Sequence, residues 1–270
     1  GLGDVYKRQV RLMDNGVGYL RIDSFTSGTA VEFRNAVNSL TNQGATSLIF
    51  DLRDNSGENL NAALVATDYC VPSGLIAQSQ DKGGNVTDLR MSDENEITLP
   101  MVCLVNGSTA SAAELFASSL RTLNGARLVG TTTQGKGTIQ SSPQRLSDGS
   151  AVVVTVAKLV CGDGSCFDGT GLTVDVERPL TADEQTAYYD YTVENDPQIQ
   201  RAVSTAQQMS GTTTVSGVNE AASSEAADSA AAESVAEGDA EAASAESTPA
   251  EAAPAESEAA GESTASSSQE

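Results

Sequence analysis

Residues 106–114 have the sequence "NGSTASAAE" and directly follow the apolar run from Met101 to Val105. The apolar run predicts a short buried strand, and the residues after it predict a helix from Ser111 to Leu123. A strand that leads at once into a helix indicates an α/β fold. A serine at this junction lies at a helix N-terminus, where free N–H groups and the helix dipole favour an oxyanion. Ser111 is therefore a candidate nucleophile.

The same serine also fits a purely structural role. Ser111 and Glu114, three residues later and ahead of apolar residues, form the pattern of a helix capping box, in which the hydroxyl accepts a backbone N–H and no chemistry follows. If Ser111 is the nucleophile, we expect Ser108 or Thr109 to provide the cap instead.

Lys136 is the candidate general base. The chain contains no histidine, so a serine hydrolase built on it cannot use imidazole. Lys136 lies between Gly135 and Gly137, 25 positions after Ser111. A neutral lysine can accept the hydroxyl proton, and we therefore expect the Lys136 side chain to be buried next to Ser111.

Two alternatives for Lys136 belong to other classes. Residues 130–136, "GTTTQGK", fit the first seven positions of a phosphate-binding loop, which would indicate a nucleotide hydrolase. Gly137 then stands where a Ser or Thr hydroxyl must hold magnesium, and no later predicted strand ends in the acidic residue that completes such a site. The nucleotide hypothesis is disfavoured for this reason, and an ordinary surface lysine remains the other alternative.

A third segment of interest is the loop "DLRDNSGEN" at residues 51–59, which follows the predicted buried strand from Ser47 to Phe50. Its Asp, Asn and Gly residues suit a tight turn. Taken alone, this pattern indicates only a turn.

Further elements alternate along the chain. Strands are predicted at residues 18–23, 75–78, 86–91 and 128–129, helices at 29–40 and 60–69, and a hairpin from 139–146 and 151–160.

Six segments, in this order, resemble the carboxyl-terminal processing protease (tail-specific protease) family, which uses a Ser-Lys dyad. They are "GVGYLRIDSF", "LIFDLRDNSG", "MVCLVNGSTASAAELFA", "ARLVGTTTQGKGTIQ", "LSDGSAVVVTVAKL" and "GTGLTVDVE", between Gly16 and about Ser204. The resemblance implies a crotonase-like, Clp-protease-like β-β-α superhelix and neither a cofactor nor a metal.

The resemblance also implies the site residues. Ser111 would be the nucleophile, Lys136 the base and Gln140 the residue that orients the lysine, while the backbone amides of Gly57 and Ala112 would form the oxyanion hole. Gln140 could equally be an ordinary polar residue on the outer face of a strand.

The loop at residues 51–59 departs from the family pattern. The family usually has Asn-Pro-Gly-Gly there, whereas this chain has Ser56 and Glu58 on either side of Gly57. Only the Gly57 amide is needed as a donor, but Glu58 puts a carboxylate close to where negative charge would develop.

The composition divides the chain into three parts. Residues 1–9 resemble translated adapter sequence and are excluded as a non-native start. Residues 10–210 form the expected protease core, and residues 211–270 an Ala/Glu/Ser-rich tail that we expect to be disordered. Thirteen acidic and no basic residues lie between Glu220 and Glu270, so the tail holds 13 of the 22 net negative charges.

The partners and compartment follow from charge, cysteines and the resemblance. No basic patch is present, which argues against nucleic acid or anionic lipid as a direct partner. Cys161 and Cys166 bracket a short loop and could form a disulfide, whereas Cys70 and Cys103 lie in apolar segments and are expected to be buried thiols. A disulfide would agree with the extracytoplasmic location that the resemblance implies. We expect an export signal or membrane anchor, a helical segment and a PDZ domain to precede Val10 in the full-length protein.

The predicted function is an exported serine endopeptidase that cleaves proteins near their carboxyl termini. The main alternative is a peptide-binding scaffold of the same fold with weak or no catalysis, which Glu58 favours. A third hypothesis is a crotonase-fold hydrolase of small acyl compounds. Labelling of Ser111 by a fluorophosphonate probe distinguishes the endopeptidase from the scaffold. Turnover of a peptide compared with an acyl thioester distinguishes it from the hydrolase of small acyl compounds.

Overall fold

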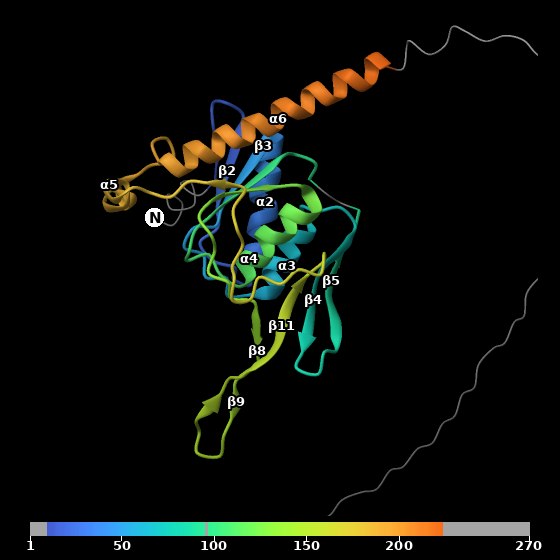
Figure 1. Ribbon diagram of the computed structural model, residues 1–270, viewed down its shortest axis with the longest axis vertical. Coiled ribbons are helices and arrows are strands. Elements are labelled where there is room, and N and C mark those ends of the chain that lie inside the picture. The colour runs from blue at the N-terminus through green and yellow to red at the C-terminus, as the bar shows by residue number, and fades with distance from the viewer. Residues whose placement is uncertain (1–9, 95–96, 224–270) are drawn as a thin grey trace, which may run out of the picture. The chain divides into compact units, whose positions relative to one another are not determined.

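The computed structural model describes residues 10–94 and 97–223 (Figure 1). The strands are β1 (Val10–Leu12), β2 (Val17–Arg21), β3 (Ser47–Asp51), β4 (Gly74–Asp81), β5 (Val86–Ser92), β6 (Met101–Val105), β7 (Arg127–Gly130), β8 (Thr138–Gln140), β9 (Gln144–Arg145), β10 (Ala151–Val152), β11 (Thr155–Cys161) and β12 (Val176–Glu177). The helices are α2 (Thr29–Asn42), α3 (Leu60–Asp68), α4 (Ala112–Ser119), α5 (Ala182–Thr186) and α6 (Pro197–Ser223), with a π-helical turn at Leu120–Asn124 and a 3-10 turn at Tyr188–Asp190. The fold is therefore mixed α/β.

The main sheet has six strands in the order β1-β2-β3-β6-β7-β12. Within this sheet β2, β3, β6, β7 and β12 are parallel to their neighbours, whereas β1 is antiparallel to β2. All residues of β3 and β6 are buried, as expected for central parallel strands covered on both faces. The carboxyl ends of β3 and β6 lie next to each other, because Asp51 pairs with Leu104. The loop of residues 51–59 and the loop that begins at Asn106 therefore leave the same edge of the sheet.

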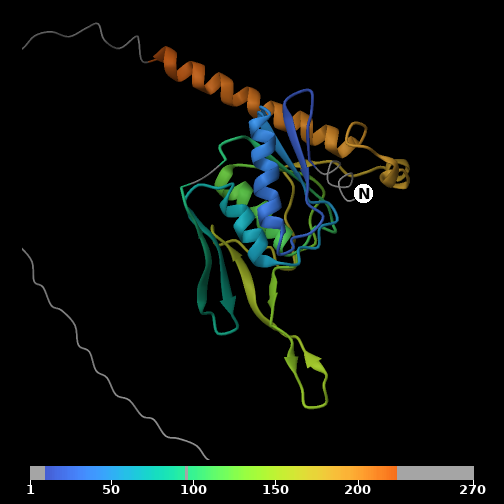
Figure 2. The same cartoon turned by 180° about the vertical axis from the view of Figure 1, so that it is seen from behind.

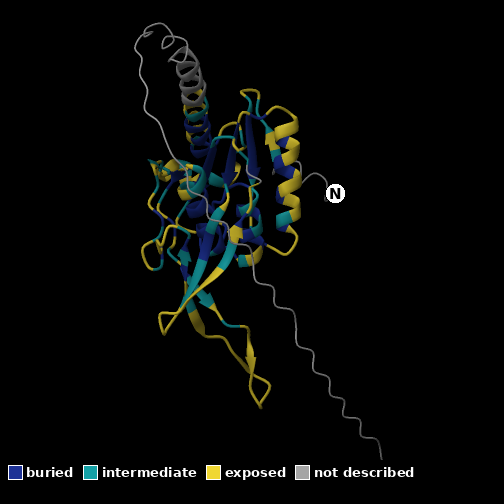
Figure 3. Ribbon diagram, turned by 90° about the vertical axis from the view of Figure 1, so that its right-hand side faces the viewer, coloured by how far each residue is buried: buried dark blue, intermediate teal, exposed yellow. Residues whose placement is uncertain are grey.

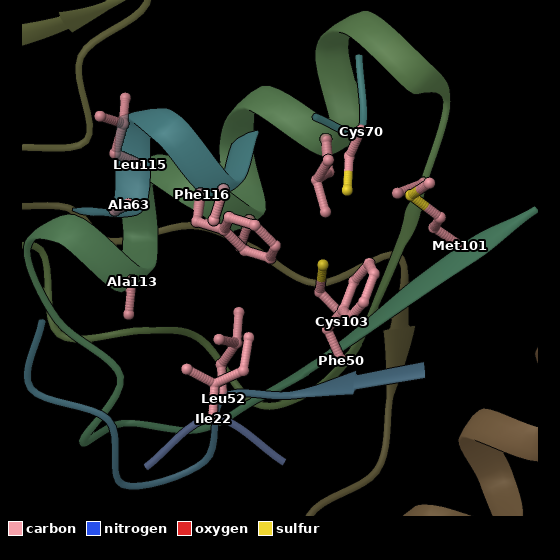
Figure 4. Close-up of a cluster of buried hydrophobic side chains, with 14 of the residues drawn as sticks. Ile22, Phe50, Leu52, Ala63, Cys70, Met101, Cys103, Ala113, Leu115 and Phe116 are labelled. Carbon is pink, nitrogen blue, oxygen red and sulfur yellow. The ribbon is translucent and has the colours of Figure 1, made fainter. Parts of the chain in front are cut away.

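Helices cover both faces of this sheet (Figures 1 and 2). On one face α2, α3 and α4 pack over a core in which the Phe116 ring contacts those of Phe25, Phe33 and Phe50. Phe50 and Phe116 are labelled in Figure 4. On the other face α6 packs through Ile199, Ala202, Val203 and Ala206. Figure 3 shows the buried strands between exposed outer helix surfaces.

A second sheet of four strands has the order β5-β4-β11-β8. The predicted hairpin of residues 139–146 and 151–160 is present but interrupted, because β8 pairs with β11 and the short β9 and β10 pair separately. Pro143 stands at the interruption, where a residue without an N–H cannot extend a strand ladder. β8 begins two residues after Lys136, so this sheet positions the segment that contains the candidate base.

Several boundaries differ from the sequence-based expectations. The helix predicted to run from Ser111 to Leu123 is α4 followed by the π-helical turn. The predicted tail began at Gly211, but α6 continues to Ser223, so the first part of that segment is helical. The remainder of the predicted tail and residues 1–9 lie outside the described residues. Among the helices that the structure describes, none combines the length and apolar character needed to span a membrane.

Candidate active site

The backbone at Ser111 has an unusual conformation. Ser111 precedes α4 with φ 57° and ψ −118°, whereas a residue at this position normally has β-region angles. Among the described residues, the other non-glycine positions with positive φ are Asp54 at 63° and Glu58 at 80°. All three lie in the two loops at the carboxyl ends of β3 and β6. Strained backbone of this kind is typically retained at functional sites.

The two loops touch at Gly57. A Cβ atom at Gly57 would lie 2.7 Å from the Ala110 oxygen, 2.8 Å from the Ala112 nitrogen and 3.0 Å from the Ser111 Cβ. Only glycine therefore fits at position 57. The Ala110 N–H also donates to the Asn55 carbonyl oxygen at 2.9 Å, which fixes the loops to each other. The structure thus brings the Gly57 backbone close to Ser111 and Ala112, the residues that the family resemblance groups with it.

The two amides predicted as oxyanion donors differ in their bonding. The Ala112 N–H belongs to the first residue of α4 and has no acceptor four residues earlier within the helix. The Gly57 N–H, in contrast, donates to Asn55 Oδ1 at 2.8 Å. Asn55 is buried and its Nδ2 donates to the Ile22 carbonyl oxygen at 2.8 Å, so this side chain is itself held in place. One of the two expected donors is engaged within the protein.

A buried carboxylate links the serine to the lysine segment. Glu114 is fully buried, and its Oε2 accepts the N–H groups of Ser111 and Lys136, each at 2.9 Å. Its Oε1 accepts the Gly135 N–H at 2.7 Å and the Thr133 hydroxyl. Ser111 stands at the N-cap position of α4 with its N–H bonded to Glu114, so the expectation that Ser108 or Thr109 would provide the cap was wrong. The capping residue serves a second purpose, because it holds both candidate segments.

The Lys136 side chain is exposed, which contradicts the expectation that it would be buried. Within the described chain, no hydrogen bond joins it to Ser111. The backbone around it is fixed, since the Gly137 N–H faces Asp168 Oδ1 at 3.3 Å and a Cβ at Gly137 would lie 2.7 Å from the Asp168 Cβ. The flanking glycines provide no side-chain cover, and burial of Lys136 would require side chains from segments distant in sequence.

Among the described residues, the hydrogen bonds of Gln140 go to residues other than Lys136. It is exposed on β8, and its amide nitrogen donates to the hydroxyls of Thr138 at 3.2 Å and Thr155 at 3.0 Å. In this structure Gln140 therefore fits the alternative interpretation, in which it is an ordinary polar residue on the outer face of a strand.

Buried charges support the loop after β3. Arg53 donates to both Asp51 oxygens and to Asp196 at the start of α6, and its guanidinium lies 5.5 Å from the centre of the Tyr188 ring. Burial would raise the pKa of Asp51, but the charge and hydrogen bonds of Arg53 outweigh it and lower this pKa. Burial also raises the pKa of Tyr188 to about 12, and its hydroxyl donates to Asp54 at 2.9 Å.

The cysteines are all thiols. Cys161 and Cys166 are not bonded to each other: Cys161 is buried on β11 with its sulfur 3.4 Å from the Ser118 hydroxyl, whereas Cys166 is exposed. The two side chains face different environments, so the bracketing loop does not form the disulfide that the spacing allowed. Cys70 and Cys103 are buried, as predicted, and face the same core (Figure 4).

Comparison with known proteins places this site in a family. The family model described as peptidase family S41 matches residues 16–178, which is more than half of the chain and includes both loops. The chain belongs to peptidase family S41. The S41 chain is 36% identical over 180 residues to the carboxy-terminal processing protease CtpA of Bacillus subtilis (strain 168), covering 66% of this chain and 38% of the relative. It is 37% identical over 166 residues to the carboxyl-terminal-processing protease of Synechocystis sp. (strain ATCC 27184 / PCC 6803 / Kazusa), covering 61% of this chain and 39% of the relative.

A solved structure supports the same assignment. The photosystem II D1 C-terminal processing protease is 34% identical, with a TM-score of 0.57 over 60% of this chain and 42% of that protein. The S41 chain thus spans about two fifths of the length of the relatives it matches.

Sequence reasoning missed two residues of the site. Asn55 looked like a turn residue, and no pattern indicated that its side chain would hold the Gly57 amide. Glu114 was recognised only as a capping residue. The capping spacing of a serine and a glutamate is local, whereas the bonds of Glu114 to Gly135 and Lys136 span more than twenty residues of sequence.

Proposed function

We propose that this S41 chain is the catalytic core of a serine endopeptidase that cleaves protein substrates near their carboxyl termini with a Ser111–Lys136 dyad. The observation that supports this most is Glu114, whose single carboxylate binds the backbone of both dyad residues. A cap alone requires the bond to Ser111. The bonds to Gly135 and Lys136 have no capping purpose, but they fix the base segment relative to the nucleophile.

The proposed reaction follows serine acyl transfer. Ser111 Oγ attacks the scissile carbonyl carbon while Lys136 Nζ takes the hydroxyl proton, and Lys136 then gives that proton to the leaving amine. Water hydrolyses the acyl-enzyme with Lys136 again as base. The oxyanion is held by the Ala112 N–H and by the Gly57 N–H, which must exchange Asn55 Oδ1 for the substrate oxygen. Catalytic hydrogen bonds are often formed only in the substrate complex, so the exposed Lys136 is compatible with this role.

Further parts of the proposal rest on the family. The mixed α/β fold would be the crotonase-like, Clp-protease-like superhelix, and the protein would act outside the cytoplasm on protein or peptide substrates without cofactor or metal. Gln140 would orient Lys136 once the amine turns toward Ser111, at the expense of its bonds to Thr138 and Thr155.

The alternative function is a peptide-binding scaffold of the same fold. The engaged Gly57 amide and the exposed Lys136 favour it, because a non-catalytic protein needs neither group free nor aligned.

Reaction with a fluorophosphonate probe separates the two functions. A protease should be labelled at Ser111, and the Ser111→Ala and Lys136→Ala variants should not be. Lys136→Arg should also be inactive on peptides, because a guanidinium does not release its proton in the working pH range. If the wild-type chain is not labelled, or if Lys136→Arg retains substantial peptidase activity, the dyad assignment is wrong. A peptide with a free apolar carboxyl end should be cleaved in preference to an acyl thioester.

A further inference from the structure

Glu58 occupies a distinctive position at the proposed site. It follows Gly57, where an added Cβ would lie 2.8 Å from the Ala112 nitrogen and 3.0 Å from the Ser111 Cβ, and it is exposed. Its φ of 80° is unfavourable for any residue with a side chain, whereas glycine would adopt it freely. The chain therefore carries a carboxylate directly after Gly57 at a cost in backbone energy.

The backbone around Glu58 is fixed on both sides. Phe25 forms a parallel bridge with Glu58, in which the Phe25 N–H donates to the Gly57 oxygen at 3.0 Å and the Asn59 N–H donates to the Phe25 oxygen at 2.9 Å. Phe25 is itself fully buried. The carboxylate is thus carried by a backbone segment that is hydrogen-bonded on both sides.

The charge of Glu58 is not neutralised within the described chain. No hydrogen bond or ion pair to a described residue holds its carboxylate. Asp54, the other acidic residue of this loop with positive φ, differs in this respect, because its carboxylate accepts from Asn106 at 2.8 Å and from Tyr188 at 2.9 Å. Glu58 is therefore the acid of this loop that remains available to a substrate.

From these observations we infer that Glu58 is a specificity-determining residue that selects substrates with a lysine or arginine next to the scissile bond. An extended peptide whose carbonyl lies between Ser111 and the Gly57 amide must pass Glu58. A cationic side chain there gains an ion pair with the unpaired Glu58 carboxylate, whereas an acidic one is repelled. The net charge of −22 further favours the encounter with basic segments. This inference rests on the proposed function and adds the substrate class.

The test uses the 270-residue chain and matched peptides that carry Lys, Gln or Glu at the residue before the scissile bond or at the residue after it. The measured quantity is kcat/KM for each peptide at low and high salt. We expect a Lys-over-Glu ratio of about tenfold or more at one of the two positions, equivalent to ~1.4 kcal/mol. The ratio should fall to about threefold or less in Glu58→Gln, and high salt should reduce it in the wild-type chain. Glu32→Gln removes an exposed carboxylate on α2 and should leave the ratio unchanged.

Each result either supports or overturns the inference. Glu58→Gly, in which the backbone strain is relieved, should show the same loss of preference, and fluorophosphonate labelling of Ser111 confirms that each variant has an intact site. A Lys-over-Glu ratio that Glu58→Gln leaves intact overturns the inference, as does a change by one common factor for all peptides, which would indicate a general effect on the dyad. Both leave the proposed function standing. A wild-type chain that is neither labelled nor active on any peptide overturns the proposed function, and this inference with it.

Discussion

At the scale of single residues, the hydrogen bonds of Glu114 to the backbone of Ser111 and Lys136 can be tested by one substitution. Glu114→Gln keeps the size of the side chain but replaces one acceptor oxygen with an NH2 group. An NH2 group cannot accept the hydrogen bonds that the donors around Glu114 now make. We expect the free energy of unfolding to fall by about 2–4 kcal/mol, because buried donors lose their acceptor. Peptidase kcat should fall by at least about a hundredfold with a smaller change in KM, since the dyad segments lose their common anchor.

The measurement combines urea unfolding with steady-state kinetics. Glu177→Gln removes an exposed carboxylate on β12 and is the matched control. If Glu114→Gln lowers stability but leaves kcat per folded molecule unchanged, the carboxylate is only a cap.

Asp51 gives a prediction about pH. Its pKa is lowered in the folded chain from the ordinary 3.8, so its ionised form stabilises the fold above that value and the contribution is lost as the pH falls through the lower, folded pKa. Asp51→Asn should therefore destabilise the chain by about 3 kcal/mol at pH 7, because Arg53 loses its buried partner. The deficit should shrink below about pH 4.

Urea unfolding at pH 7, 5 and 3 tests this, with the exposed Asp14→Asn as the control. A deficit that stays constant down to pH 3 would show that the ionisation of Asp51 is not what stabilises the loop.

At the scale of elements, the segment between β7 and β8 is fixed by close backbone packing. Gly137→Ala would place a Cβ 2.7 Å from the Asp168 Cβ and 2.8 Å from its nitrogen. Since neither neighbour is the end of a flexible side chain, we expect a loss of about 1–3 kcal/mol in unfolding free energy and a marked loss of peptidase activity. Gly28→Ala, where the nearest atom is the Glu32 side chain at 3.8 Å, should change stability by less than about 1 kcal/mol. Equal stability of both variants would mean that the segment moves freely.

The elements also show what the sequence could predict. β6 was predicted with its observed limits, because a continuous apolar run bounded by Pro100 and Asn106 has one plausible length. The short strands β1 and β12 were missed, since two or three residues carry no periodicity. α6 was also missed, although Ile199, Ala202, Val203 and Ala206 have helical spacing and provided a usable signal.

The candidate site was predictable to a similar, partial extent. The family resemblance grouped Ser111, Ala112 and Gly57, and the structure brings their two loops into contact beyond the ends of the neighbouring parallel strands β3 and β6. The exposure of Lys136 and the bond from Gly57 to Asn55 depend on side-chain packing between distant segments, which local patterns do not encode.

At the scale of the whole molecule, α6 determines where the chain can be shortened. Its buried residues Ile199, Ala202, Val203 and Ala206 cover one face of strands β2, β3, β6 and β7, and partly buried Met209 packs against the same cluster. A chain that ends at Ser210 keeps all of these contacts. It should therefore unfold within about 2 °C of the full chain and cleave peptides at the same rate, because the removed acidic residues would contribute no apolar burial.

A chain that ends at Asn195 should behave differently. It loses α6 and the Asp196 carboxylate that binds Arg53 at 2.8 Å, and it exposes the sheet residues Ile49, Val102 and Leu104. Each large apolar side chain contributes about 1.5–3 kcal/mol through burial, so the sum approaches the entire stability of an ordinary domain, about 5–15 kcal/mol. We expect this chain to be unfolded or aggregated, as measured by circular dichroism and size-exclusion chromatography. If the Ser210 chain instead melts several degrees lower or loses activity, the residues beyond Ser210 pack on the core and take part in its function.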